Sequence, residues 1–322
     1  MKKICCVLLC LLSFERAFCW GFFAHQKINY YAVFLLPPGM LVFYKAHAGF
    51  LSEHAVDPDK RRYAVAAEGP RHYIDLDRYG PPPWDSLPRT WAAAVQRFSE
   101  DSLHAHGIVP WWIQAMLQRL TKAFREKDAA RILKLSAEIG HYIADAHVPL
   151  HASSNHNGQH TGQHGIHGFW ESRLPELLAE KEWNFLIGKA SYLQHPSDFI
   201  WHRVMESGRA ADTVLAREKE LTAYFPVDRK FAFEPRNGKL VRQYATGFSK
   251  AYDRLLDGMV ERRMRQSVFA VSSFWYTAWV DAGQPDLAIL TGFTFHPETQ
   301  EEFDRLNRAW KTMEMIGRKE EE

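Results

Sequence analysis

The sequence predicts an all-α protein, built as a single mostly helical domain. Two observations carry this prediction. Apolar residues recur at three-to-four spacing over several long segments, and proline and glycine gather between those segments. Patterns typical of strands are hard to find. The chain has 322 residues, which is enough for one large domain with a well-buried core.

The clearest helices lie in the middle of the chain. Residues 111–124, WWIQAMLQRLTKAF, follow Pro110 and keep the apolar spacing of an amphipathic helix. Residues 129–147, AARILKLSAEIGHYIADAH, repeat that spacing and stop before Pro149. Further helices are expected at 22–35, 88–104, 168–180, 197–221 and 240–280. The apolar run at 268–280 is too short for a membrane span and predicts a buried final helix.

The N-terminus has the pattern of a secretory signal peptide. A basic start, MKK, precedes a short apolar core, and Ala17 and Cys19 stand at the −3 and −1 positions of a cleavage site. Cleavage after residue 19 would make Trp20 the first residue of a secreted or periplasmic protein. All four cysteines lie in residues 1–19, so the mature chain would have no disulfides and would draw its stability from its core and from metal.

The charge of the mature chain is balanced. Removal of residues 1–19 takes away Lys2, Lys3, Arg16 and Glu15, and the remaining basic and acidic residues are equal in number. No basic surface of the kind that binds duplex nucleic acid is indicated, although a small site for single strands stays open. No stable protein partner is implied, and we expect a monomer.

Histidine is concentrated in one short part of the chain. Seven of the 16 histidines fall between His141 and Glu171, and the segment HYIADAHVPLH opens this part. His141 and Asp145 are four residues apart on a predicted helix, so they share one face. His167 and Glu171 repeat this spacing at the start of the next helix. Two such pairs, with His151 beyond Pro149, predict a metal site, because zinc takes imidazole and carboxylate ligands.

HYIADAHVPLH, followed by a His and an acidic residue four later, resembles the signature of the zinc-dependent phospholipase C and S1/P1 nuclease superfamily. The match includes the Pro-Leu pair before His151. The resemblance covers residues 20–285 and implies a mostly helical zinc-dependent phosphoesterase domain. Residues 286–322 would then form a C-terminal extension, helical in part.

The resemblance implies ligands elsewhere in the chain. Members of this superfamily bind zinc through the amino group and carbonyl of an N-terminal Trp, and through a His soon after, which correspond to Trp20 and His25. They also use an Asp and a His about fifteen residues apart. Asp57 and His72 have this spacing, whereas Asp59 lies thirteen residues before His72 and stays an alternative.

Three zinc ions per chain are implied by this resemblance. The first would be held by Asp57, His72, His141 and Asp145. The second would be held by His151, His167 and Glu171. The third would be held by Trp20, His25 and a shared Asp145. Such a centre would activate a water molecule to attack phosphorus.

The catalytic residues expected are Asp57, Asp145 and Lys60. Lys60 stands where nuclease relatives place a phosphate-binding Arg. A charged side chain that is simply exposed to solvent is an equal alternative for Lys60. Tyr73 and Asp75 fall where relatives bind the substrate. The remaining loop histidines, His156, His160 and His164, are expected to be solvent-exposed.

Three functions are compatible with these residues. The preferred one is an exported phospholipase C-like phosphodiester hydrolase, because Glu171 replaces the Asp usual in the nucleases and the mature chain has no cysteine. The second is an S1/P1-type nuclease acting on single-stranded nucleic acid or 3'-nucleotides. The third is a non-catalytic exported zinc-binding protein, which would not need a complete ligand set that includes Trp20.

Overall fold

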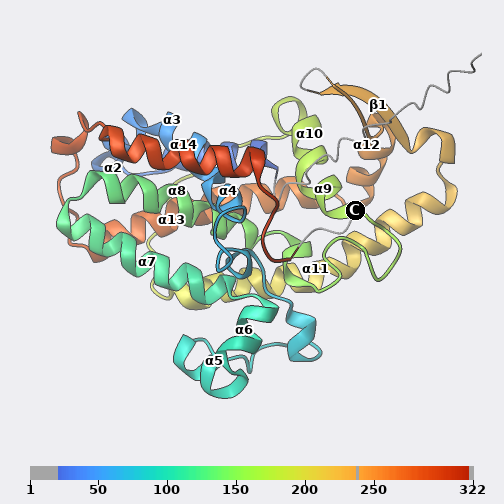
Figure 1. Cartoon of the computed structure of the whole chain (residues 1–322), viewed down its shortest axis with the longest axis horizontal. Helices are drawn as coiled ribbons and strands as arrows, with labels where there is room; N and C mark the ends of the chain where they lie inside the picture. The colour runs from blue at the N-terminus through green and yellow to red at the C-terminus, as the bar shows by residue number, and fades with distance from the viewer. Residues whose placement is uncertain (1–20, 237–238, 319–322) are drawn as a thin grey trace, which may run out of the picture.

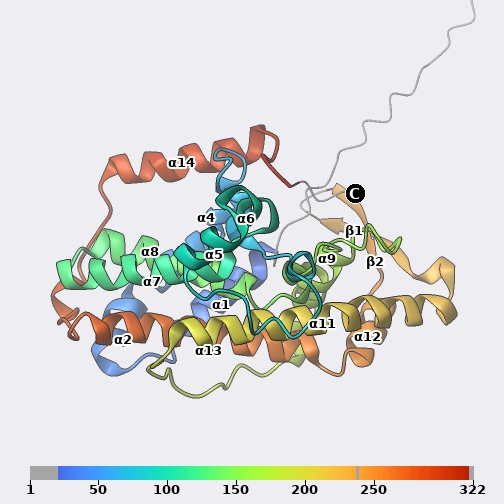
Figure 2. The ribbon, with the colours of Figure 1, turned by 90° about the horizontal axis from the view of Figure 1, so that it is seen from below.

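The computed structural model describes residues 21–236 and 239–318. The predicted signal peptide and Trp20 lie outside these ranges. The all-α prediction is confirmed, because helices cover 67% of the chain and strands cover 3%. Most of the longer helices lie along the long axis of the molecule, as Figures 1 and 2 show.

The elements carry the labels of Figure 1. The described α-helices are α1 (Phe22–Val33), α2 (Pro38–Ala46), α3 (Ala48–Glu53), α4 (Asp57–Arg61), α5 (Trp91–Phe98), α6 (Glu100–His106), α7 (Val109–Glu126), α8 (Ala129–Asp145), α9 (Ile166–Gly168), α10 (Leu174–Glu182), α11 (Pro196–Tyr224), α12 (Thr246–Leu255), α13 (Met259–Asp281) and α14 (Pro297–Thr312). The short 3-10 turns are η1 (His54–Val56), η2 (Gly69–His72), η3 (Leu76–Tyr79), η4 (Pro149–Ala152), η6 (Val227–Arg229) and η7 (Ala288–Leu290), and η5 (Phe169–Arg173) is a π-helical turn. One antiparallel hairpin joins β1 (Phe231–Arg236) to β2 (Lys239–Tyr244).

Three predicted helices differ from the structure. The helix expected at 88–104 is split at Ser99, whose φ of 66° ends α5 and whose side chain caps α6. The helix expected at 168–180 begins with the π-helical turn η5. The helix expected at 240–280 begins instead as β2, because these residues pair with β1. It is also interrupted between α12 and α13, where Asp257 and Gly258 have positive φ.

The N-terminal helix α1 lies in the centre of the molecule and packs against α13, α3 and α8. Its crossing with α8 is close because Gly140 has no side chain. A Cβ atom there would lie 2.1 Å from Asn29 Oδ1. Asn29 joins three helices by donating hydrogen bonds from Nδ2 to the carbonyls of Leu51 (3.1 Å) and Ala137 (3.0 Å). This crossing brings His25, one turn before Asn29, against His141.

The predicted final helix is buried in the core. The apolar run at 268–280 belongs to α13, which packs against α1, α7 and α8. No helix in the described ranges combines the length and the apolar character needed to cross a bilayer.

The predicted C-terminal extension lies against the rest of the chain. Helix α14 crosses α4, and its Phe303 is buried beside Phe50 and His54. Beyond α14, residues Met313–Arg318 turn back over the molecule toward α9 (Figure 1). We call this segment the C-terminal strap. Its Ile316 amide donates a hydrogen bond to the carbonyl of Arg62 at 2.9 Å.

Candidate metal centre

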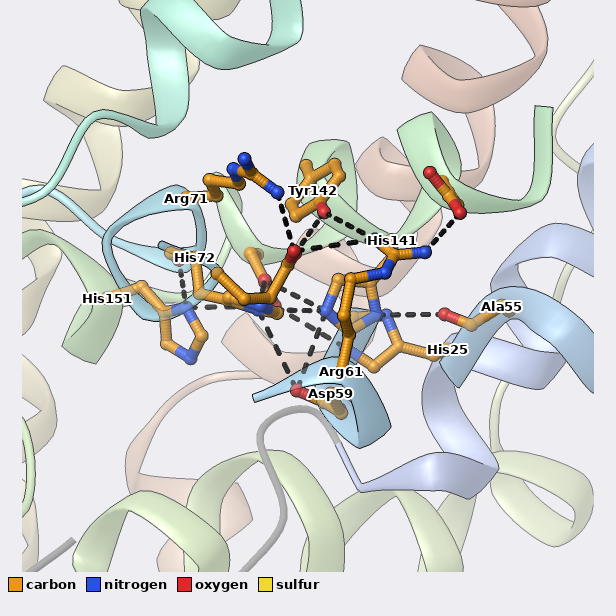
Figure 3. Close-up of polar contacts among 12 residues, drawn as sticks. His25, Ala55, Asp59, Arg61, Arg71, His72, His141, Tyr142 and His151 are labelled. Carbon is orange, nitrogen blue, oxygen red and sulfur yellow. Dashed lines mark hydrogen bonds and ion pairs between the residues drawn. The ribbon is translucent and has the colours of Figure 1, made fainter. Parts of the chain in front are cut away.

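Four side chains meet beside α4, although up to 86 positions separate them in the sequence. His72 Nδ1 lies 3.0 Å from His141 Nε2 and 3.0 Å from Asp145 Oδ2. His141 Nε2 lies 3.2 Å from the same Asp145 oxygen. Asp59 Oδ1 closes the group, at 3.7 Å from His72 Nδ1 and 3.6 Å from His141 Nε2. Figure 3 shows these contacts as dashed lines that converge between the rings.

These distances fit a tetrahedral zinc site. A tetrahedron with metal–ligand bonds of about 2.0–2.1 Å has ligand atoms about 3.3–3.4 Å apart. The measured separations in this group, 3.0–3.7 Å, lie around that value. The four side chains therefore form a cage of the right size for one zinc ion.

The structure places Asp59, and not Asp57, in this cage. Asp57 lies on the other side of α4, where it accepts hydrogen bonds from His54 (2.6 Å) and Lys60 (3.1 Å). Residues two apart on a helix differ in direction by about 200°. Asp57 and Asp59 therefore cannot both face the centre, and the fifteen-residue spacing selects the wrong one of the two.

A second group shares Asp145 with the first. His25 Nε2 lies 3.4 Å from Asp145 Oδ1, which is the oxygen that faces away from His72 and His141. The His25 ring stacks on His141 with 3.8 Å between ring centroids. His25, His141 and Asp145 could hold a metal ion together. The α-amino group of Trp20, predicted to complete this site, lies outside the described residues.

The third group is formed by His151 and by the predicted pair His167 and Glu171, all of which follow α8. Glu171 Oε2 lies 3.1 Å from His167 Nε2 and 3.4 Å from His151 Nε2. Glu171 is on the π-helical turn η5, and turns of this kind recur at functional sites. His151, His167 and Glu171 are buried and could hold a further metal ion.

We call the side chains of all three groups the inner cluster: His25, Asp59, His72, His141, Asp145, His151, His167 and Glu171.

Backbone carbonyls orient two of the imidazoles. His141 Nδ1 donates to the carbonyl of Ala55 at 2.8 Å, and His151 Nδ1 donates to the carbonyl of His72 at 2.7 Å. Each ring therefore carries its proton on Nδ1 and directs the lone pair of Nε2 into the cluster. Hydrogen bonds of this kind fix the ring orientation and tautomer of metal-binding histidines.

A buried polar network contacts the His72 ring at its Nε2 atom. Its Nε2 lies 3.6 Å from Glu68 Oε1, and Glu68 also contacts Tyr142, Arg61 and Arg71 (Figure 3). Burial acts to raise the pKa of Glu68, but these contacts outweigh it and hold that pKa below its ordinary value. Glu68 is therefore an ionised partner that fixes the His72 ring.

Several polar atoms of the inner cluster have no hydrogen-bond partner within the described ranges. They are His25 Nδ1 and Nε2, both Asp59 oxygens, Asp145 Oδ1, His151 Nε2 and both Glu171 oxygens. Burying polar atoms in this state is costly. A bound cation removes that cost, so these unsatisfied atoms fit a metal centre.

The position of Asp145 also indicates a bound cation. It is the last residue of α8, and the last turn of that helix has no basic residue. A carboxylate at a helix C-terminus is repelled by the helix dipole, typically by about 0.3–1 kcal/mol. Asp145 is also fully buried. Cations bound by the groups to which its oxygens belong would offset both penalties.

Burial and close contacts shift the pKa values of three residues of the inner cluster. Burial and the neighbouring His25 lower the pKa of His141, which favours the neutral ring that a metal requires. Burial acts to raise the pKa of Asp145, but its contacts with the imidazoles of His141 and His151 hold that pKa well below the ordinary value. Burial acts to lower the pKa of His72, but its contacts with Asp145 and Glu68 raise it to about 9. A metal would displace the His72 proton at neutral pH.

A small pocket opens over the inner cluster. Its lining includes His72, His151 and His167 from the cluster, together with residues that form its outer wall. Four of these outer residues are Arg62, Tyr73, His156 and Arg318, and Asp75 pairs with Arg318 beside them. We call these five residues the outer rim. Of the two residues predicted to bind substrate, Tyr73 therefore lines the pocket and Asp75 contacts it through Arg318.

The basic residue that α4 and its C-terminal end contribute to the pocket is Arg62 and not Lys60. The Lys60 ammonium is paired with Asp57 on the far side of α4, whereas Arg62 is buried and lines the pocket. Arg62 follows Asp59 by three residues, which is the spacing that separates Lys60 from Asp57. The predicted ligand Asp57 and the predicted phosphate-binding residue Lys60 are therefore each replaced by the residue two positions later, Asp59 and Arg62.

The histidine-rich loop divides into two parts. His160 and His164 are exposed, as predicted. His156 is buried, with its ring 6.0 Å from that of His167, and the prediction of an exposed side chain is wrong for this residue. The loop is closed by Asn157, whose Oδ1 accepts hydrogen bonds from the amides of Gly165 and His167. Its fold therefore places His156 at the rim.

Comparison with known proteins adds no assignment. No model of a known protein family matches the chain. No curated protein matches it either.

Proposed function

We propose that this protein is a zinc-dependent phosphoester hydrolase of the phospholipase C type, exported after cleavage before Trp20. The observation that carries the proposal is the inner cluster. In it Asp145 contacts His25 through one oxygen and His72 and His141 through the other, and a third group that could hold a metal lines the same pocket. When bound, three zinc ions would lower the pKa of a water molecule and balance the charge of a phosphate group.

The chain itself would position the reacting groups. Asp145 would hold two metal sites at a fixed separation through its two oxygens. The carbonyls of Ala55 and His72 keep the Nε2 atoms of His141 and His151 free for ligation. Arg62, buried at the pocket wall, would bind non-bridging phosphate oxygens, because a guanidinium pairs well with phosphate.

The pocket wall supports a substrate with a cationic headgroup. Tyr73 presents a ring face, and Asp75 presents a carboxylate with little solvent exposure. An aromatic face beside a carboxylate is suited to a quaternary or primary ammonium group. A phospholipid such as phosphatidylcholine carries that group next to its phosphodiester.

A second candidate function is cleavage of single-stranded nucleic acid or 3'-nucleotides. The observation that favours it is the flat guanidinium of Arg318, whose Cζ lies 4.2 Å from the centre of the Tyr73 ring. A nucleobase could stack on Tyr73 in the same way.

The test is a parallel assay of zinc-loaded protein whose first residue is Trp20. Substrates are phosphatidylcholine vesicles, single-stranded DNA and RNA, and 3'-nucleotides, each with and without a chelator. Chelator-sensitive release of the phosphorylated headgroup supports the phospholipase. Turnover of nucleic acid alone selects the second candidate, and zinc binding without any turnover leaves a non-catalytic zinc-binding protein.

A matched form with one extra residue before Trp20 tests the N-terminal ligand. We expect it to lose one zinc ion and most of its activity. Equal zinc content and equal turnover in the two forms would remove Trp20 from the ligand set.

A further inference from the structure

The outer rim is occupied by a side chain from the far end of the chain. Arg318, 243 residues after Asp75, forms an ion pair with that carboxylate at 2.8 Å. Its guanidinium also lies against the Tyr73 ring, at 4.2 Å from the ring centre. The two residues expected to hold the substrate are therefore both engaged by the protein itself.

Further contacts fix Arg318 in this place. Its Nε donates to His156 Nδ1 at 3.2 Å, and its Nη2 donates to the carbonyl of Ser153 at 3.3 Å. The strap backbone is held as well, because Ile316 donates to the Arg62 carbonyl and Arg62 Nη2 donates to the Arg318 carbonyl at 3.1 Å. The strap is thus docked through both its backbone and its side chain.

Little room is left in the pocket. Beside Arg318 the cavity over His72, His151 and His167 has a volume of about 20 Å³. One water molecule needs roughly 10–15 Å³ by the same kind of measure. A phosphodiester with any headgroup is far larger, so it cannot reach the inner cluster while Arg318 is in place.

We propose that the C-terminal strap, Met313–Arg318, is an intramolecular competitive inhibitor whose Arg318 occupies the substrate-binding part of the pocket. Substrates enter only by displacing it, and Arg318 therefore selects for ligands that compete well for Tyr73 and Asp75. The proposal rests on the proposed function in taking this pocket as the substrate pocket.

The test compares the full-length mature protein with Arg318→Ala and Arg318→Glu. The first removes the ion pair and the ring contact, and the second places a negative charge beside Asp75. Arg305→Ala, an exposed arginine on α14, is the matched control. A chain ending at Thr312 provides a further variant that removes the whole strap and keeps α14.

Two measurements do not depend on turnover. The first is hydrogen exchange of the Ile316 amide, which we expect to become about 10-fold faster in both Arg318 variants, because undocking exposes it. The second is the rate at which a chelator removes zinc, which we expect to rise by a similar factor. Both rates should stay at the wild-type value in Arg305→Ala.

The kinetic measurement uses bis(4-nitrophenyl) phosphate. An inhibitor that docks in the same chain raises the apparent KM by the inverse of the fraction of time it is undocked. With the strap undocked about one tenth of the time, we expect KM to fall about 10-fold in Arg318→Ala, with kcat changed less than about two-fold. A rise in KM would overturn the proposal and make Arg318 a substrate-binding residue. Unchanged exchange and zinc-removal rates would also overturn it.

If no phosphoester is hydrolysed by any form, the proposed function fails, while faster exchange and faster zinc removal would still support a docked strap.

Discussion

The inner cluster and the outer rim are adjacent, but they are built in different ways. Much of the inner cluster comes from helices: His25 lies on α1, and His141 and Asp145 lie four residues apart on α8. The outer rim comes from irregular segments and from the C-terminal strap, whose Arg318 meets Asp75 across 243 positions. The groups that could hold a metal therefore depend largely on helical spacing, whereas the outer rim depends on long-range contacts between irregular segments.

The largest effect is expected from Asp145→Asn. Asp145 faces His25 with one oxygen and both His72 and His141 with the other. Loss of its charge should weaken two metal sites and lower kcat by on the order of 10³-fold. Zinc content and kcat, measured together, check this expectation. Activity within a few-fold of wild type would show that Asp145 does not bridge two metals.

A smaller effect, and a sharper comparison, comes from Asp59→Asn beside Asp57→Asn. Only Asp59 lies in the cage with His72 and His141. Loss of a residue that only supports a ligand already costs about 10–100-fold in metal affinity, so we expect Asp59→Asn to weaken zinc binding by at least about 100-fold. Asp57→Asn should change it less than about five-fold. Zinc titration of the two variants measures the difference. The opposite order would restore Asp57 as the ligand.

The inner cluster should also depend on the crossing of α1 and α8. In Gly140→Ala the new methyl group would collide with Asn29 and force the helices apart, so we expect a loss of about 1–3 kcal/mol in unfolding free energy. The His25 site should lose zinc at the same time. Gly49→Ala is the control, because a Cβ there meets no atom within 4 Å. Thermal unfolding that gives equal results for the two variants would contradict this account.

Sequence reasoning found the part of the centre that follows regular spacing. His141 with Asp145, and His167 with Glu171, lie in the groups that their four-residue spacing predicts. Spacing to His72 favours Asp57 and leaves Asp59 as an alternative, and only the direction of each side chain around α4 shows that Asp59 is the one beside His72 and His141. His156 and Arg318 were missed for another reason. Their contacts depend on how a glycine-rich loop and a distant strap fold back, and no local pattern encodes those contacts.

The smallest predicted effect concerns a half-buried carboxylate outside both regions. Asp253 lies on α12, and burial together with the charges of Glu182 and Glu261 raises its pKa to about 6. Because the folded pKa is above the unfolded value of 3.8, the stability from its protonated form is complete below 3.8 and is lost as the pH rises through 6. Asp253→Asn, which stays neutral, should therefore stabilise the protein by about 1 kcal/mol at pH 7.5, after allowance for solvent screening, and should have almost no effect at pH 4. Thermal unfolding at the two pH values checks this, and an equal shift at both would contradict it. The same substitution at Asp145 should instead give the loss of on the order of 10³-fold in kcat described above, because the charge of that carboxylate would be needed to hold metal.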